Sequence, residues 1–292
     1  MNKDSILAKQ MIPLRDGLRT YYFDIGINVL KWKNMPNAIP PRYPEKWLYE
    51  NGLCVFFQPD GLDYMCLPVV QGSIKKNVYG EPSEWRAMAL GEFAGRISGQ
   101  VLDASNSVLI RNDSSYRPTK PYVDALINQM INVELTTRMN INAQKMPFFF
   151  KGTEDTILQQ KNLFLEFMEC EPAFFKTKFA SDEFEIFQSG APFIANDLVD
   201  VYTEYDARIL TYLGINNLPI EKKERLLTDE VGINKEEKSL IRDSRLVQRQ
   251  LACDEINKLF NLNVSIEVNE SLEEDINATG TMPTTQWSGS KD

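Results

Sequence analysis

Prolines and a glycine delimit two long helices in this sequence. The first is predicted from Pro118 and Pro121, which suit the first turn of a helix, to just before Pro147, which cannot continue it. The second follows Pro192 and ends at Gly214, because glycine readily adopts the left-handed conformation of a helix C-cap. At about 1.5 Å per residue, the first helix extends over roughly 35 Å. Any fold of this chain must accommodate two helices of this length.

Short runs of β-type residues dominate the region before these helices. Residues 53–111 contain the run Leu53–Phe57 and a second run over residues 64–70. A helix is predicted over residues 14–33, where apolar side chains recur at helical spacing before Pro36. The chain is therefore predicted to be α+β and mainly helical.

The segment between the two long helices, residues 146–190, combines strand-like runs with one helical pattern. It is predicted to form a compact α/β insert. It opens with Phe148, Phe149 and Phe150, which are either ordinary core residues or a surface that faces a partner.

Three further segments are predicted after the second long helix. Residues 215–243 are polar and rich in charges of both signs, which is typical of a solvated loop. A helix is predicted over residues 244–260, with Leu251, Ile256 and Leu259 facing inward. Residues 263–268 can add one strand.

The composition excludes several classes of function. The chain has no histidine, which removes the most common general base and the most common metal ligand. It also lacks the GxxxxGK[ST] phosphate loop of an ATPase. Its four cysteines are far apart, so we expect buried free thiols, no metal site and no cofactor. No run approaches the roughly 18 apolar residues of a membrane span, so we expect a soluble protein without a membrane partner.

The charge balance is acidic. Lys and Arg number 32 against 41 Asp and Glu, a net charge of -9. A protein that grips nucleic acid tightly needs clustered cations to neutralise phosphates. The balance therefore argues against a protein that binds nucleic acid tightly through phosphate contacts.

A set of short segments, in order along most of the chain, resembles one protein family. The segments are Asn142 to Lys145 before Pro147, Ala191 to Phe193, Leu213 to Ile215, residues 220–231, Ala252 and Cys253, Ile256 and Asn257, Leu259, and residues 262–264. Together they resemble the upper-collar portal, or head-tail connector, protein of small protein-primed short-tailed podoviruses.

The resemblance implies a phage portal fold with two long stem helices, a β-rich wing and an α/β clip. It divides the chain into an N-terminal helix and wing (1–117), stem helices (118–145 and 191–214), clip (146–190), channel loop (215–243), and a C-terminal helix, crown and tail (244–292).

The resemblance also implies a function and partners. Such proteins form a ring of about twelve subunits at one capsid vertex. The ring is the channel for packaging and ejection of double-stranded DNA and the attachment site of the tail. The implied partners are the packaging ATPase, the major capsid protein and lower-collar or tail proteins. The implied location is the virion, with the host cytoplasm during assembly.

Three groups of residues take implied roles. The cations that touch passing DNA from the channel loop are Lys222, Lys223, Arg225, Lys235 and Lys238. The candidates that face the lumen from the stem are Asp197, Asp200, Glu204 and Gln188. The clip contacts for a partner are Phe148, Phe149 and Phe150.

Two of these positions depart from the family pattern. The family carries lysines near the start of the second long helix, where this chain has Gln188 and Asp197. A mechanism with lysine rings at those two levels is therefore not supported, and retention of DNA has to rest on the channel loop. Without the resemblance, the acidic residues are an ordinary solvated face that includes a Glu204 to Arg208 pair.

Two other readings stay open. The chain can be a tail adaptor or another structural protein of the virion. Less favoured is a metal-dependent nuclease, because Pro59 and Asp60 resemble the start of one nuclease motif but no correctly placed ExK follows. A turn explains these two residues better.

Overall fold

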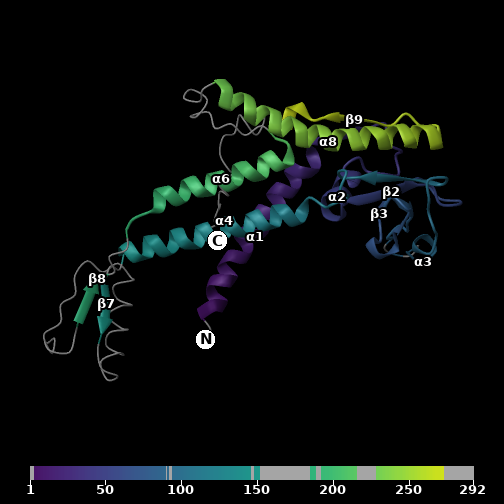
Figure 1. The fold of residues 1–292 in the computed structure, drawn as a ribbon. Helices are drawn as coiled ribbons and strands as arrows, with labels where there is room; N and C mark the ends of the chain where they lie inside the picture. The colour runs from purple at the N-terminus through teal and green to yellow at the C-terminus, as the bar shows by residue number, and fades with distance from the viewer. Residues whose placement is uncertain are drawn as a thin grey trace, which may run out of the picture. The chain divides into compact units, whose positions relative to one another are not determined.

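Figure 1 shows the computed structural model of the chain, which describes residues 3–89, 91, 94–145, 148–151, 185–188, 192–215 and 228–272. The chain forms two compact units. Unit 1 comprises Met1–Ile131 and Thr203–Asp292, and unit 2 comprises Asn132–Tyr202. The long helices α4 (Lys120–Lys145) and α6 (Ala195–Leu213) each contribute residues to both units.

Unit 1 begins with helix α1 (Lys3–Asn28), which is followed directly by strand β1 (Leu30–Lys33). β1 pairs antiparallel with β9 (Ser265–Val268) from the far end of the described chain, which confirms the strand predicted there. The prediction of one helix over residues 14–33 was wrong in its last part. Pairing with a distant strand overrides the local helical spacing, and sequence periodicity cannot register such a partner.

A three-stranded antiparallel sheet lies at the centre of unit 1. Its order is β3 (Met65–Pro68), β2 (Leu53–Phe57) and β6 (Ser107–Arg111). Helix α2 (Tyr43–Asn51) precedes β2 and contacts all three strands. The two β-type runs predicted from the sequence are thus confirmed as β2 and β3.

Both faces of this sheet are covered, so every residue of β2 is buried. Successive side chains of a strand point to opposite faces. Cys54 and Phe56 therefore pack into a cluster with Ile256, and Val55 packs into a second cluster with Trp85. Two apolar cores on either side of one strand fix its register.

Smaller elements complete the β-rich region. A 3-10 turn η1 (Gln71–Ser73) leads into a hairpin of β4 (Lys75–Lys76) and β5 (Pro82–Glu84). Helix α3 (Ala94–Ser98) lies between this hairpin and β6 in the sequence.

The two long helices have the ends that proline and glycine predicted. α4 begins at Lys120, between Pro118 and Pro121, and α6 ends at Leu213. Gly214 follows with a φ of 88°, the left-handed conformation expected of a C-cap. Within unit 1, Ile127 of α4 and Ile209 of α6 are fully buried.

Helix α8 (Thr228–Phe260) begins well before residue 244, where the sequence predicted its start. Residues 228–243 are therefore helical and not loop. The stretch is rich in Glu and Lys. Both residues are common in solvated loops, but both also have high helix propensity, so a charged composition does not distinguish a loop from an exposed helix. Figure 1 shows α8 running alongside β9, with which it is in contact.

Of the three residues of α8 predicted to face inward, Ile256 is fully buried as predicted, but the prediction is wrong for the two leucines. Leu251 is 52% exposed and Leu259 is 38% exposed. The side of α8 that packs on unit 1 is formed by Ala252, Cys253 and Ile256, all of them buried. A helix at the surface of a unit buries one stripe only, so apolar residues beside that stripe remain exposed.

In unit 2, strand β7 (Phe148–Lys151) pairs antiparallel with β8 (Glu185–Gln188). The Asn140 side chain connects α4 to the chain that enters α6. Its amide nitrogen donates to the Pro192 carbonyl at 2.7 Å, and its oxygen accepts from the Ile194 N–H at 3.1 Å. The helical pattern predicted inside the insert lies outside the described residues.

Candidate functional site

The acidic residues predicted to line a channel are exposed on α6. Asp197 and Asp200 belong to unit 2, and Glu204 belongs to unit 1. The Glu204 carboxylate pairs with the Arg208 guanidinium one turn later. An exposed pair of this kind contributes less than about 1 kcal/mol. The exposure of the three acidic residues is expected both of an ordinary solvated face and of a channel lining. Their role in a channel therefore stays a prediction.

The predicted cations fall into two groups. Lys222, Lys223 and Arg225 lie outside the described residues. Lys235 and Lys238 lie on the first part of α8, and not on a loop. One helical turn separates these two lysines.

The remaining predicted residues lie on the strand pair of unit 2. Phe148, Phe149 and Phe150 are the first three residues of β7, and Gln188 is the last residue of β8. In the register of this pair, Gln188 lies opposite Phe148. The structure thus brings the predicted clip residues and Gln188 together on neighbouring strands.

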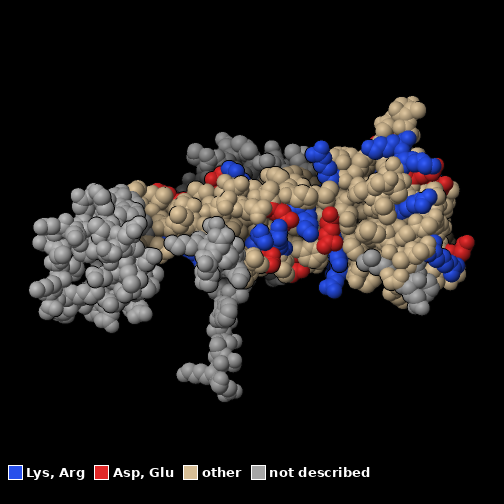
Figure 2. All heavy atoms as spheres, turned by 90° about the horizontal axis from the view of Figure 1, so that it is seen from below, with Lys and Arg blue, Asp and Glu red and all other residues tan. Residues whose placement is uncertain are grey.

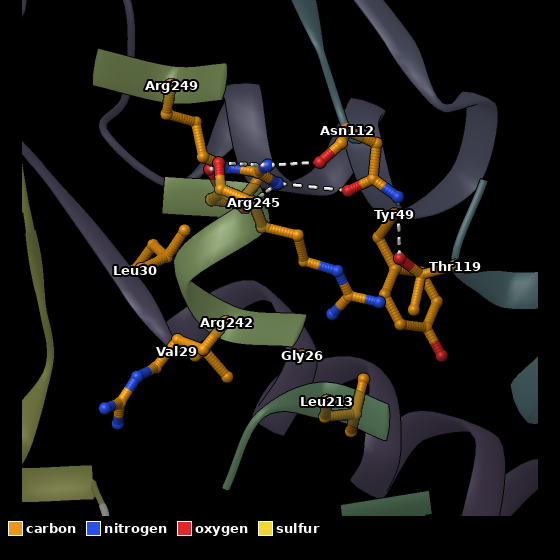
Figure 3. A pocket seen from close by; sticks show the side chains of 11 residues that line it. Gly26, Val29, Leu30, Tyr49, Asn112, Thr119, Leu213, Arg242, Arg245 and Arg249 are labelled. Atoms are coloured by element: carbon orange, nitrogen blue, oxygen red, sulfur yellow. Dashed lines mark hydrogen bonds and ion pairs between the residues drawn. The ribbon is translucent and has the colours of Figure 1, made fainter. Parts of the chain in front are cut away.

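A buried ion pair in unit 1 joins Arg249 of α8 to Glu45 of α2. Figure 3 shows Arg249 directed toward Asn112, with which it is also hydrogen-bonded. Arg249 of α8 is 2% exposed and Glu45 of α2 is 5% exposed. Two parallel bonds join them, Nε to Oε1 at 2.8 Å and Nη2 to Oε2 at 2.9 Å. Glu45 also accepts from the Trp32 indole at 2.9 Å, and Arg249 donates to the Asn112 backbone carbonyl at 2.6 Å.

This network satisfies the charges that it buries. Charged groups are costly to bury unless they are paired and fully hydrogen-bonded. The Asn112 side chain extends the network, since its oxygen accepts from Arg249 at 3.1 Å and its nitrogen donates to Thr119 at 3.0 Å. Because Thr119 directly precedes α4, the network fixes the start of that helix against α8 and α2.

Arg245, one turn before Arg249, lines a small cavity of about 20 Å³ beside this network. Its guanidinium lies 4.9 Å from the centre of the Tyr212 ring, which provides a cation–π contact. Burial lowers the pKa of Arg245. In Figure 3 its guanidinium extends toward Tyr49 and Thr119, whereas Arg242 points away. The cavity is about the size of one water molecule, so it is a packing feature and not a ligand site.

A second contact joins α1 to α4 and α6 within unit 1. The Tyr22 hydroxyl donates to the Asp206 carboxylate at 2.6 Å and lies 3.6 Å from the Met130 sulfur. Nearby, the Arg19 guanidinium pairs with Asp124 at 2.8 Å. Burial raises the pKa of Asp206, and the hydrogen bond from Tyr22 opposes this rise only in part.

This raised pKa predicts the effect of Asp206→Asn. An aspartate whose folded-state pKa is raised stabilises the fold at low pH and loses that contribution as the pH rises through the folded value. Asparagine keeps the acceptor for Tyr22 and carries no charge. We therefore expect the variant to be more stable than the wild type at pH 7, with the difference shrinking toward pH ~4, near the unfolded pKa of about 3.9.

Thermal unfolding of both proteins across this pH range measures the effect. A variant that is less stable than the wild type at pH 7 would show that the ionised carboxylate is favourable in its site.

Sequence reasoning missed the Arg249 network. The available signal was an arginine on the same helical stripe as Ala252, Cys253 and Ile256, since residues three, four and seven apart share a helix face. A charge on an apolar stripe indicates a buried ion pair. The identity of its partner had no signal, because Glu45 lies 204 residues away in the sequence.

Comparison with known proteins gives the class of this chain as a phage head-tail connector. The chain belongs to the family described as Phage Connector (GP10), whose model matches residues 15–273. In the described ranges, no group of three or more His, Cys, Asp or Glu is placed to hold a metal ion. Nor is any described helix both long and apolar enough to cross a membrane.

Three solved structures are similar to the chain at low sequence identity. One, the portal and tail of native bacteriophage P68, has 16% identity and a TM-score of 0.45, covering 96% of this chain and 97% of that one. An HK97 family phage portal protein from Corynebacterium diphtheriae has 9% identity and a TM-score of 0.45, covering 91% and 95%. The virion of a native gene transfer agent particle has 10% identity and a TM-score of 0.43, covering 91% and 85%.

Proposed function

We propose that this connector protein assembles into a ring at one capsid vertex, forms the channel through which double-stranded DNA enters and leaves the head, and attaches the tail. Membership of the Phage Connector family carries this proposal. The capsid protein, the tail proteins and a separate packaging ATPase are its partners, and the ring itself catalyses nothing.

The dimensions of the long helices support a channel of this kind. Twelve helices spaced at about 9 Å make a circle of roughly 34 Å in diameter. Subtracting one helix width of about 10 Å leaves roughly 24 Å, enough for a DNA duplex. Six helices arranged in this way leave too little room.

The surface charge supports weak contact with the DNA. Figure 2 shows Lys and Arg side chains interspersed with Asp and Glu on the described part of one face. Phosphate contacts strengthen with each clustered cation, and the net charge of -9 works against them. A chain with mixed charges lets DNA slide instead of holding it.

The oligomeric state of the purified protein tests the proposal. Light scattering and negative-stain images are expected to show rings of about twelve subunits with an open centre. A stable monomer or dimer at assembly concentrations would contradict the proposal.

The cations of residues 215–243 provide a further prediction. Replacing Lys222, Lys223 and Lys235 by alanine is expected to leave ring assembly intact and to impair retention of packaged DNA. Lysine side chains can make transient phosphate contacts without reading the sequence. The measurement is the fraction of filled heads that keep their genome after packaging. The control replaces Glu221, Glu224 and Glu236 by alanine and is expected to retain DNA as the wild type does. If the lysine variant also retains DNA as the wild type does, the role proposed for these cations is contradicted.

A further inference from the structure

Tyr116, between β6 and α4, has a backbone conformation that is unusual for an aromatic residue. Its φ is 60°, in the left-handed region. A Cβ atom clashes with the following carbonyl in this region, and asparagine tolerates it better than a bulky residue does. The other non-glycine residues with a positive φ in the described ranges are both asparagines, Asn34 and Asn261. A tyrosine keeps this conformation only where surrounding contacts hold it there.

Three contacts hold the Tyr116 side chain. Its hydroxyl donates to the carboxylate of Glu81, which directly precedes β5, and accepts from the Arg111 guanidinium at 3.1 Å. The same guanidinium lies 4.9 Å from the centre of the Tyr116 ring and pairs with Glu81 at 3.1 Å. Both hydrogen bonds have a charged partner, which makes them stronger than neutral ones. The hairpin of β4 and β5 and the end of β6 thus meet at this one side chain.

The chain after Tyr116 leads directly into the buried Arg249 network. The carbonyl of Arg117 accepts from the Asn112 side-chain nitrogen at 2.8 Å. The same Asn112 side chain donates to Thr119, which directly precedes α4, and accepts from Arg249 at 3.1 Å. A change in the Tyr116 backbone would therefore move the Arg117 carbonyl and disturb the position from which α4 starts.

The contact around Tyr116 is exposed, whereas the Arg249 network is not. The Arg111 and Glu81 side chains are 33% and 48% exposed. Water and salt weaken an exposed ion pair, so this contact opens more readily than the buried one. A strained residue that is held by an exposed contact relaxes when that contact breaks.

We propose that Glu81, Arg111 and Tyr116 form a latch through which the β4–β5 hairpin controls the start of α4. When the latch is closed, Tyr116 stays left-handed and the Arg117 carbonyl stays on Asn112. When it opens, Tyr116 relaxes to a negative φ, the Arg117 carbonyl leaves Asn112 and the first turn of α4 loosens. A partner that displaces the hairpin thereby changes the start of a long helix. The inference does not depend on the proposed ring.

Hydrogen exchange of the full-length chain, followed in peptides that cover residues 116–123, tests the latch. Tyr116→Phe removes the hydroxyl but keeps the ring and the strained backbone, and Glu81→Gln removes the charged acceptor. Each is expected to speed exchange in this segment about fivefold or more, because the free energy of local opening sets the exchange rate. All variants are compared in the same assembly state, which light scattering checks.

Glu84→Gln is the matched control. It removes an equal charge from the same hairpin, where Glu84 pairs with Lys75 at 2.6 Å, and is expected to leave exchange of residues 116–123 unchanged. Wild-type exchange in Tyr116→Phe and Glu81→Gln overturns the inference, because local contacts such as the Asp113 turn would then hold the backbone unaided. An increase that is spread over the whole chain overturns it as well, since it reports lost global stability.

A further variant tests whether strain drives the opening. Tyr116→Asn also lacks the hydroxyl, but asparagine adopts the left-handed conformation more readily. Its exchange is expected to stay closer to the wild-type rate than that of Tyr116→Phe, although it loses the ring. Equal or faster exchange in Tyr116→Asn shows that relief of strain does not open the latch, and overturns the inference.

Discussion

Replacing Arg249 by methionine is expected to lower the free energy of unfolding by about 3–5 kcal/mol, because it leaves the carboxylate of Glu45 buried without its counter-charge. The two side chains are 2% and 5% exposed, so water cannot take the place of the guanidinium. The substitution also leaves the Asn112 carbonyl without the donor that lies 2.6 Å from it. Urea unfolding followed by tryptophan fluorescence measures the loss, since Trp32 donates to the same carboxylate.

Two further variants isolate the buried pair. Arg208→Met removes the exposed pair with Glu204 and is expected to cost less than about 1 kcal/mol. The double variant Arg249→Met and Glu45→Met removes both buried charges and is expected to recover part of the loss, because apolar replacements often match a buried ion pair in stability. If Arg249→Met and Arg208→Met lower the free energy of unfolding equally, burial of the Arg249–Glu45 pair does not determine its contribution to stability.

Local signals in the sequence predicted the elements whose ends are set by local chemistry. Pro118 and Pro121 marked the start of α4, and Gly214 marked the end of α6, because their backbone preferences act within one turn. The apolar run Leu53–Phe57 predicted β2 with its observed bounds. The ordered set of short segments indicated the family, which the match over residues 15–273 confirms.

Features that depend on distant partners could not be predicted in this way. β1 is a strand because β9 pairs with it, and the sequence around Trp32 carries only a helical spacing. Glu45 looks like an ordinary acidic residue in the first turn of α2 until Arg249 is placed beside it. The exposure of Leu251 depends on which stripe of α8 packs on the sheet, and two apolar stripes are present in the sequence.

The lumen-facing role of the acidic residues on α6 stays a prediction for a related reason. Asp197, Asp200 and Glu204 are exposed on α6. In a ring, the positions of the neighbouring copies decide whether an exposed face lines the channel or lies on the outside, and one chain does not contain that information. The charge of these three residues was enough to predict that they are exposed to solvent.

Gly52→Ala is expected to lower the free energy of unfolding by about 2–5 kcal/mol, through two effects at the junction of α2 and β2. Gly52 has a φ of 79°, where a residue with a Cβ atom is strained by about 1–2 kcal/mol. A Cβ atom there would also lie 2.7 Å from the Arg117 carbonyl carbon and from the Pro118 nitrogen. These are backbone atoms leading into α4, so they cannot rotate aside, and overpacking of this kind costs about 1–3 kcal/mol.

Gly61→Ala is the matched control, because Gly61 has a similar φ of 71° and open space around its Cβ position. It carries the conformational strain alone, so its expected cost is about 1–2 kcal/mol. The difference between the two variants in urea unfolding isolates the steric contact between the α2–β2 junction and the chain that enters α4. Equal costs would contradict this contact. A larger cost at Gly52 shows that the β-rich region and the start of α4 are packed together closely enough for one methyl group to disturb both.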